Sequence, residues 1–274
     1  MTGPVSERVS ARKKTALITG ASSGIGEAFA DAFAAEGFDL VITARREERL
    51  RAVAERIRGE HDSRVDVMPC DLTDQGAPAR LCAGVEERGL TIDALVNNAG
   101  FGTRGGFTSS PWHTHAAMLQ VLVVAVTELT YRLLPGMVDR RYGRIINVAS
   151  LAGVADAPAG TVYSAAKTFV VRFSASLSRE VSKHGVHVTA VCPGLTRTEF
   201  HDAANARETV VGMPRWLWMD AHAVARQGVA AVMAGKAVYV NGAVNRATAA
   251  LFRLVPLPIV IAAGRRLTNA VRKS

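Results

Sequence analysis

Short apolar runs alternate with longer segments of helical spacing along most of this chain. The runs are TALIT (15–19), DLVITA (39–44), RVDVMP (64–69), DALVNN (93–98), GRIINVAS (143–150), VHVTAVCP (186–193) and AVYV (237–240). This alternation predicts β-α-β units. Several runs are apolar on both faces, as the strands of a covered parallel sheet must be. We therefore expect an α/β fold, a doubly wound, Rossmann-like parallel sheet of about seven strands with helices on both faces.

The composition is that of one globular domain with reduced cysteines. The chain has 274 residues, 49% of them hydrophobic, which is enough to bury a large core. We expect a single domain over 1–274, with a core at about 13–240 and a helical C-terminal extension at 241–274. The cysteines, odd in number and far apart, are Cys70, Cys82 and Cys192. Free thiols and the polar residues 1–14, which lack the apolar stretch of a secretory signal, favour a cytoplasmic protein.

The basic excess of the chain, 33 Lys and Arg against 24 Asp and Glu, gives a net charge of +9. Nucleic-acid binding is one explanation. Inside the chain, however, the positive charges are interleaved with acids in the pattern of a solvated helix face, as at 44–60. We therefore expect no nucleic-acid partner and an anionic cofactor instead. We also expect no metal site, because His113 and His115 would diverge on a helix and have no ligand residue near them.

An apolar segment near the C-terminus, LVPLPIVIAAG (254–264), is too short to span a bilayer and contains two prolines. With the arginines around it, the segment suits either peripheral contact with a membrane surface or packing against a partner subunit or its own domain. Packing is the simpler alternative. We expect the chain to form a homodimer or a homotetramer.

Three glycines lie between the first predicted strand and the first predicted helix. They are Gly20, Gly24 and Gly26, spaced G-x-x-x-G-x-G. Residues without a Cβ let the backbone bend sharply and let N–H groups approach a pyrophosphate at the positive end of the helix. Ser22 and Ser23 add hydroxyl donors for phosphate oxygens. The pattern predicts a dinucleotide site, although a glycine-rich turn by itself is often only a turn.

Tyr163 and Lys167 stand four residues apart in the helical segment TVYSAAKTFVVRF. This spacing puts a phenol and an ammonium on one helix face, where the positive charge favours the phenolate and lowers the tyrosine pKa. Such a tyrosine can exchange a proton with a substrate oxygen. Ser150 closes the fifth predicted strand at its carboxyl end, where open α/β sheets bind ligands, and could orient the same oxygen. An ordinary amphipathic pair is the alternative for Tyr163 and Lys167 taken alone.

Together these motifs resemble the short-chain dehydrogenase/reductase family over roughly residues 13 to 240. TGASSGIG is similar to its cofactor motif, CDL to its adenine contact, NNAG to its strand-four motif, YSAAK to its Y-x-x-x-K and PGLTRT to its P-G-x-x-x-T. The resemblance implies that Tyr163 is the general acid/base, Ser150 the substrate-oxygen anchor, and Lys167 the pKa tuner and a ribose ligand. From the residues and the resemblance together, the predicted cofactor-binding residues besides Tyr163 and Lys167 are Gly20, Ser22, Ser23, Gly24, Ile25, Gly26, Arg45, Arg46, Asp71, Leu72, Asn98, Ala99, Gly100, Pro193, Gly194, Thr196 and Thr198.

One residue departs from the family pattern. Where the family usually carries an asparagine that supports a water and proton relay to the lysine, this chain has Leu122, in MLQVLVVAVTELT. An apolar side chain cannot hold that water. The nearest polar residues, Gln120 and Thr127, do not project in the direction of Leu122 on a helix.

The end of the second predicted strand indicates which cofactor is used. An NAD enzyme needs a carboxylate there for the ribose hydroxyls, and an NADP enzyme needs cations for the 2′-phosphate. The chain has Ala44 followed by Arg45 and Arg46, which predicts NADP(H). The alternative is that both arginines simply begin an exposed helix.

A small hydrophobic substrate is suggested by the aromatic and apolar residues of two segments. One is the loop after NNAG, with Phe101 and Phe107, and the other is the stretch 196–220, rich in Trp and Met toward its end. Such side chains suit an apolar carbonyl or secondary alcohol, or they pack on the domain or on a neighbouring subunit. We therefore predict an NADP(H)-dependent oxidoreductase. The alternative is a nucleotide-binding protein of the same fold with little or no turnover, used for structure or redox sensing.

Overall fold

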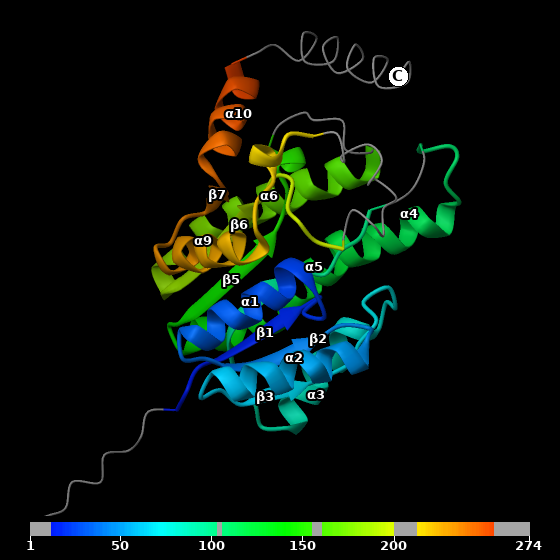
Figure 1. Cartoon of the computed structure of the whole chain (residues 1–274). Helices are drawn as coiled ribbons and strands as arrows, with labels where there is room; N and C mark the ends of the chain where they lie inside the picture. The colour runs from blue at the N-terminus through cyan, green and yellow to red at the C-terminus, as the bar shows by residue number, and fades with distance from the viewer. Residues whose placement is uncertain (1–11, 103–105, 155–160, 200–212, 255–274) are drawn as a thin grey trace, which may run out of the picture.

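Seven strands form one parallel sheet in the computed structural model of the chain, which describes residues 12–102, 106–154, 161–199 and 213–254. The strands are β1 (Thr15–Thr19), β2 (Asp39–Thr43), β3 (Val65–Val67), β4 (Ile92–Asn97), β5 (Gly143–Val148), β6 (Val186–Cys192) and β7 (Val238–Val240). Their order in space is β3-β2-β1-β4-β5-β6-β7 (Figure 1). The predicted Rossmann-like fold is confirmed, and every predicted strand is present.

Helices cover both faces of this sheet. They are α1 (Gly24–Ala35), α2 (Glu47–Glu60), α3 (Ala77–Glu87), α4 (Trp112–Leu119), α5 (Ala125–Asp139), α6 (Thr161–Val181), α9 (Ala221–Met233) and α10 (Ala243–Leu254). Helices α1, α2 and α9 pack on one face, and α3, α5 and α6 pack on the other (Figure 1). A short π-helix, η1 (Gln120–Val124), joins α4 to α5.

Alternation along the strands divides the core between the two faces. In β1, Ala16 and Ile18 pack against α1, α2 and α9, while Leu17 between them packs with the α3 and α5 layer. All three side chains are buried, because successive residues of a strand point to opposite faces and both faces are covered. This is why the apolar runs of the sequence are nearly continuous.

The strand order places a switch point beside β1. The chain runs outward from β1 to β2 and β3, then crosses back to pair β4 with the other edge of β1. In open α/β sheets the crevice at such a point, at the carboxyl ends of the strands, is where ligands bind. The glycine turn follows β1, the NNAG sequence ends β4, and Ser150 follows β5, so these motifs meet at one end of the sheet.

The run from α4 through η1 to α5 is long and apolar enough to cross a membrane by length and composition alone. Its inner side packs against β4, β5 and α3, as a core helix does. Its outer side exposes Trp112, Val124 and Tyr131. The expected homodimer or homotetramer stays a prediction.

The C-terminal extension begins after β7 with α10. Helix α10 ends at Leu254, so most of the apolar segment 254–264 lies outside the described residues. The two placements considered for that segment, on a membrane surface or packed on protein, stay predictions.

Candidate active site

The turn between β1 and α1 requires its glycines for two different reasons. Gly20 and Gly24 have φ of +67° and +62°, a conformation that residues with a Cβ rarely adopt. At Gly26 the constraint is space, because a Cβ there would lie 2.2 Å from the Gly20 carbonyl oxygen and 2.4 Å from Asn98 Nδ2. Glycines at this spacing thus allow the turn, the start of α1 and the end of β4 to pack in close contact.

The first turn of α1 faces this end of the sheet with its N–H groups uncapped. Ser23 stands at the N-cap position and makes no side-chain capping bond. The free N–H groups and the helix dipole favour an anion at this position. The turn therefore fits the pyrophosphate of a dinucleotide.

Asn98 and Thr19 hold β4 against this turn. The Asn98 side chain donates to the carbonyl oxygens of Thr19 (3.0 Å) and Gly20 (3.3 Å). The Thr19 hydroxyl accepts from the backbone N–H of Asn98 (2.9 Å) and of Ala99 (3.0 Å). Of the predicted cofactor contacts in NNAG, Asn98 and Ala99 thus also have a structural role, while Gly100 is exposed.

Ser150, Tyr163 and Lys167 converge at the carboxyl end of β5. The Ser150 hydroxyl accepts from the backbone N–H of Ala152 at 3.2 Å, which places it at the start of a short 3₁₀ turn, and it is hydrogen-bonded to the Tyr163 phenol. Lys167 Nζ lies 5.7 Å from the centre of the Tyr163 ring and donates to the carbonyl oxygen of Val148 at 2.7 Å. The i, i+4 spacing therefore puts both side chains on the helix face that meets Ser150.

The pKa of Tyr163 differs from the sequence-based expectation. We expected the neighbouring ammonium to lower it, but burial of the phenol raises it, and the hydrogen bond with Ser150 only partly opposes this effect. Burial also lowers the pKa of Lys167 to about 8, because its ammonium loses the surrounding water. Desolvation is thus the dominant influence on the pKa of both groups.

A chain of buried polar side chains beneath these residues was not predicted. Asn97 Nδ2 donates to Asn147 Oδ1 at 2.8 Å, and Asn147 Nδ2 donates to the Ser174 hydroxyl at 2.9 Å. It connects β4, β5 and α6, and so it ties the helix that carries Tyr163 and Lys167 to the strand that precedes Ser150. The sequence did hold a signal, since Asn147 is a polar residue within an otherwise apolar strand.

Leu122 lies in the π-helix and is packed beside Tyr163. It is 1% exposed and forms a cluster with Met118 and Ala166, against which the Tyr163 ring packs. Thr127 donates to the carbonyl oxygen of Val123, whereas the Nε2 of the buried Gln120 has no partner among the described residues. The π-helix itself had no sequence signal, and π-helical turns are frequent at functional sites.

We expect Leu122→Asn to destabilise the protein by about 1–3 kcal/mol without a gain in turnover, because the new amide would lie among apolar side chains. Melting temperature and kcat measure the two effects. Leu129→Asn, another buried leucine of this helical run, calibrates the stability cost away from the active site. A several-fold rise in kcat at an unchanged melting temperature would contradict this expectation.

The two predicted phosphate-binding arginines have different surroundings. Arg46 donates to the hydroxyls of Ser22 (3.1 Å) and Ser23 (2.8 Å), beside the glycine turn. It also pairs with Glu199, a residue that the sequence analysis did not single out. Arg45 is exposed and has no hydrogen bond or ion pair within the described parts of the chain. Both residues lie between β2 and α2, and Arg46 is the N-cap residue of α2.

The remaining predicted cofactor residues lie at the same end of the sheet. The exposed Asp71 accepts from the backbone and the hydroxyl of Thr73, and Leu72 beside it is buried.

After β6, the hydroxyl of Thr196 donates to the Gly194 carbonyl at 3.1 Å, and the Pro193 carbonyl accepts from the backbone N–H of Leu151. Thr198 lies against Gly24, and Ile25 is packed beside the core of the α1 face. Their contacts with a cofactor stay predictions.

The aromatic residues considered for the substrate pocket are partly described. Phe107 is 54% exposed, and its ring lies 5.1 Å from that of His115, while Trp216 is 67% exposed. Phe200 lies outside the described residues. The ends of the segment 196–220 are joined by backbone hydrogen bonds, from Arg197 to Met219 and from Met219 to Leu195.

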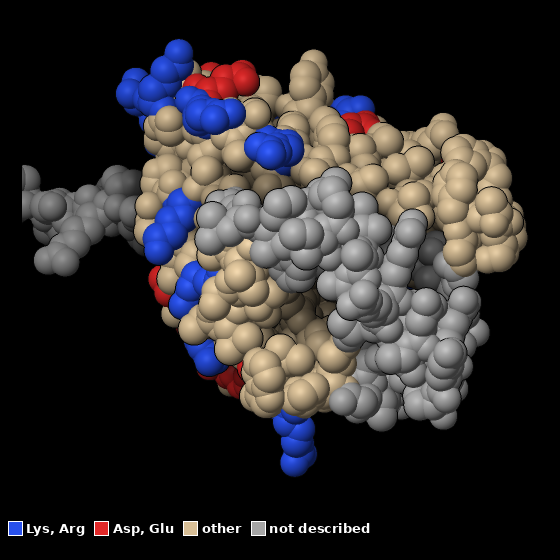
Figure 2. All heavy atoms as spheres, turned by 90° about the horizontal axis from the view of Figure 1, so that it is seen from above, with Lys and Arg blue, Asp and Glu red and all other residues tan. Residues whose placement is uncertain are grey.

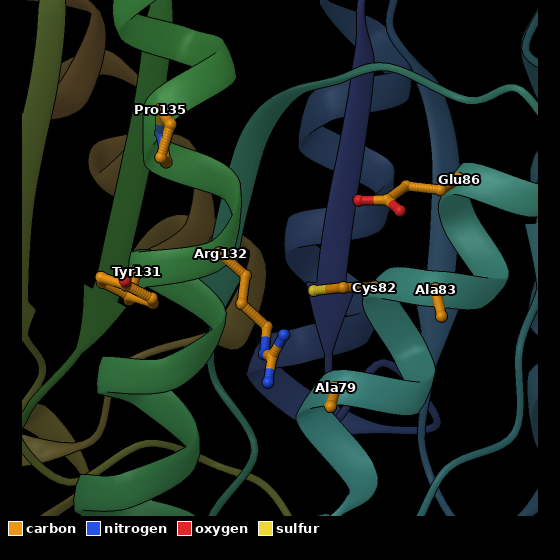
Figure 3. A pocket seen from close by; sticks show the side chains of 7 residues that line it. All are labelled: Ala79, Cys82, Ala83, Glu86, Tyr131, Arg132 and Pro135. Atoms are coloured by element: carbon orange, nitrogen blue, oxygen red, sulfur yellow. The ribbon is translucent and has the colours of Figure 1, made fainter.

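A separate groove of about 340 Å³ lies between α3 and α5, with Cys82 and Arg132 extending into it from opposite sides (Figure 3). Burial raises the pKa of the Cys82 thiol to about 11, so it stays protonated and is a poor nucleophile at neutral pH. Arg132 pairs with Glu128 on its own helix.

One group of possible metal ligands occurs among the described residues: Asp31, Glu60 and His61. Arg56 pairs with both carboxylates, at 2.9 Å from Asp31 and 3.0 Å from Glu60. Arg56 already supplies a positive charge to these carboxylates, and we assign no metal to this group of residues.

The sequence model of the short chain dehydrogenase family matches residues 14–209, most of the sheet and the whole site. The chain belongs to this family. Among relatives of this short-chain dehydrogenase, a sulfoacetaldehyde reductase of Chromohalobacter salexigens is 38% identical over 189 residues, 67% of this chain and 73% of the relative.

Two solved structures extend the comparison of this short-chain dehydrogenase. One is a short-chain dehydrogenase from Sphingobium yanoikuyae in complex with NADPH, with TM-score 0.76 and 33% identity over 83% of this chain and 87% of that one. The other is a bulky-bulky ketone specific alcohol dehydrogenase from Comamonas testosteroni. It has TM-score 0.73 and 29% identity, and the match covers 90% of this chain and 96% of that one. The chain is thus a member of an oxidoreductase family that binds a nicotinamide cofactor.

Proposed function

We propose that this chain is an NADP(H)-dependent oxidoreductase that interconverts an apolar carbonyl compound and the corresponding secondary alcohol. The observation that carries the proposal is the convergence of Ser150, Tyr163 and Lys167 at the carboxyl end of β5, at the same end of the sheet as the glycine turn. A proton donor, an anchor for the substrate oxygen and a cation are then within reach of one ligand.

Each of these side chains has a separate task. The nicotinamide, when bound, supplies or accepts the hydride. Tyr163 gives its phenolic proton to the substrate oxygen during reduction and takes it back during oxidation. Ser150 donates to the same oxygen and orients it. Lys167, with a pKa of about 8, is mostly protonated at pH 7, and its ammonium can stabilise the phenolate that remains.

The cofactor preference rests on the cations at the end of β2. Arg45 is exposed there without a partner in the described chain, and Arg46 lies beside the serines of the glycine turn. Seen from above, the Lys and Arg side chains lie mainly toward the left side of the molecule with Asp and Glu among them, and the preference does not depend on them (Figure 2). The related structure from Sphingobium yanoikuyae contains NADPH, which supports the same preference.

We expect Arg45→Ala to weaken NADPH binding roughly 10- to 100-fold, because charge-assisted hydrogen bonds are worth about 1.5–3 kcal/mol, and to change NADH binding little. Dissociation constants for both cofactors, from fluorescence titration, give the result. Arg51→Ala is the matched control, since Arg51 is another exposed arginine, in the first turns of α2, but it pairs with Glu47. Equal losses for NADPH and NADH would assign Arg45 to folding instead.

An apolar substrate is supported by two exposed aromatic side chains, Phe107 in the segment after β4 and Trp216 in the segment after β6. The ketone specificity named for the Comamonas testosteroni relative is consistent with it. The test is NADPH consumption across a panel of ketones and aldehydes of increasing apolar size, with Tyr163→Phe as the blank. Consumption that requires Tyr163 supports the proposal, and its absence across the panel counts against it.

A second candidate is a nucleotide-binding protein with little or no turnover. One observation favours it: Leu122, where the family usually has an asparagine, is packed beside Tyr163 among apolar side chains. The panel separates the two candidates. NADPH binding without consumption of any carbonyl compound would favour this second function.

A further inference from the structure

The carboxylate of Glu199 pairs with two arginines at the start of α2, the N-cap residue Arg46 and Arg49 in the first turn. Its Oε2 accepts from Arg46 Nη1 at 2.9 Å, and its two oxygens accept from Arg49 Nη1 at 2.6 and 2.8 Å. These hydrogen bonds hold the pKa of Glu199 below its usual value, and those from Arg49 have the largest effect. Glu199 is therefore ionised at neutral pH and neutralises charge on both arginines.

This ion-pair group, which we call the Glu199 cluster (Arg46, Arg49 and Glu199), lies at the edge of the cofactor site. Arg46 Nη2 contacts the hydroxyls of Ser22 and Ser23, in the turn that leads into α1. Thr198, next to Glu199, packs so closely on Gly24 that a Cβ there would lie 2.9 Å from its methyl group. The carboxylate thus stands where the cations at the end of β2 meet the glycine turn.

We propose that Glu199 competes with the 2′-phosphate of NADP(H) for Arg46 and Arg49, and so determines how strongly the site prefers NADP(H) over NAD(H). A carboxylate and a phosphate monoester use the same guanidinium donors, but the phosphate carries more charge and one more oxygen. Glu199 is 49% exposed, and pairs in water are weak, so a phosphate can displace it. This inference rests on the proposed NADP(H) preference.

The chain offers a matched control for the removal of this charge. Glu47 is 48% exposed, against 49% for Glu199, and pairs with Arg51 on the same helix. Glu47→Gln therefore removes one exposed carboxylate from α2 without freeing Arg46 or Arg49. Neither residue is part of the catalytic group, and both substitutions keep the size of the side chain.

The experiment measures dissociation constants for NADPH, NADH and 2′,5′-ADP in the full-length protein and both variants. We expect Glu199→Gln to bind NADPH and 2′,5′-ADP roughly two- to fivefold more tightly, as loss of a weak competing ion pair requires, and NADH nearly as before. Glu47→Gln should resemble the unmodified protein for all three ligands.

Several results would overturn the inference. Unchanged or weaker binding of 2′,5′-ADP by Glu199→Gln would show that Glu199 does not compete for the phosphate. Weaker binding of NADPH and NADH alike would mean that the ion pairs close over the cofactor instead. An equal gain in Glu47→Gln would mark a general charge effect. The proposed function is judged separately, by NADPH consumption, whereas 2′,5′-ADP binding needs no turnover.

Discussion

Replacing Tyr163 with phenylalanine is expected to lower kcat by roughly 10²- to 10⁴-fold, the usual contribution of a positioned general acid or base. The substitution removes only the hydroxyl that is hydrogen-bonded to Ser150 and leaves the ring in place beside Leu122. NADPH binding and melting temperature should therefore change little. Carbonyl reduction at saturating substrate, with titration of NADPH, measures both parts of this expectation.

Tyr142→Phe is the matched control for the loss of a phenolic hydroxyl. Tyr142 stands just before β5, and the centre of its ring lies 4.0 Å from Lys14 Nζ and 4.3 Å from Arg144 Cζ. Its hydroxyl has no task in the proposed reaction, so this variant should keep full activity. If Tyr163→Phe retained the kcat of the unmodified protein, the role assigned to Tyr163 would be wrong.

Gly26→Ala is expected to destabilise the protein by about 1–3 kcal/mol and to weaken NADPH and NADH binding together. The new Cβ would lie 2.2 Å from the Gly20 carbonyl oxygen and 2.4 Å from Asn98 Nδ2, and neither can give way without opening the turn. Melting temperature and the two dissociation constants report the effects.

Gly59→Ala shows how the same substitution behaves without crowding. Gly59 lies near the end of α2, and a Cβ there would meet nothing within 4 Å. Because alanine favours a helix over glycine by roughly 0.5–1 kcal/mol, this variant should be as stable as the unmodified protein or slightly more so. Normal stability and cofactor affinity in Gly26→Ala would refute the close-contact explanation.

Features that depend on nearby residues were visible in the sequence. The seven strands follow from apolar runs of the right length, and the turn after β1 follows from glycines at two positions of positive φ. Tyr163 and Lys167 share a helix face because i, i+4 spacing alone requires it. The spacing of the motifs thus predicted the fold and the composition of the candidate site.

Features that depend on distant segments were decided only by the tertiary structure. Glu199 meets Arg49 across 150 positions of the chain, and no local pattern indicates that pairing. The same holds for Asn97 and Asn147, which meet because β4 and β5 are neighbours in the sheet.

The electrostatics of the site show this division most clearly. The sequence by itself determined that an ammonium stands beside a phenol, and from this a lowered tyrosine pKa was predicted. Only the tertiary structure decided how deeply the two groups are buried, and burial raises the pKa of Tyr163 and lowers that of Lys167. Spacing along a helix fixes which groups are neighbours, but the removal of water depends on every element that packs around them.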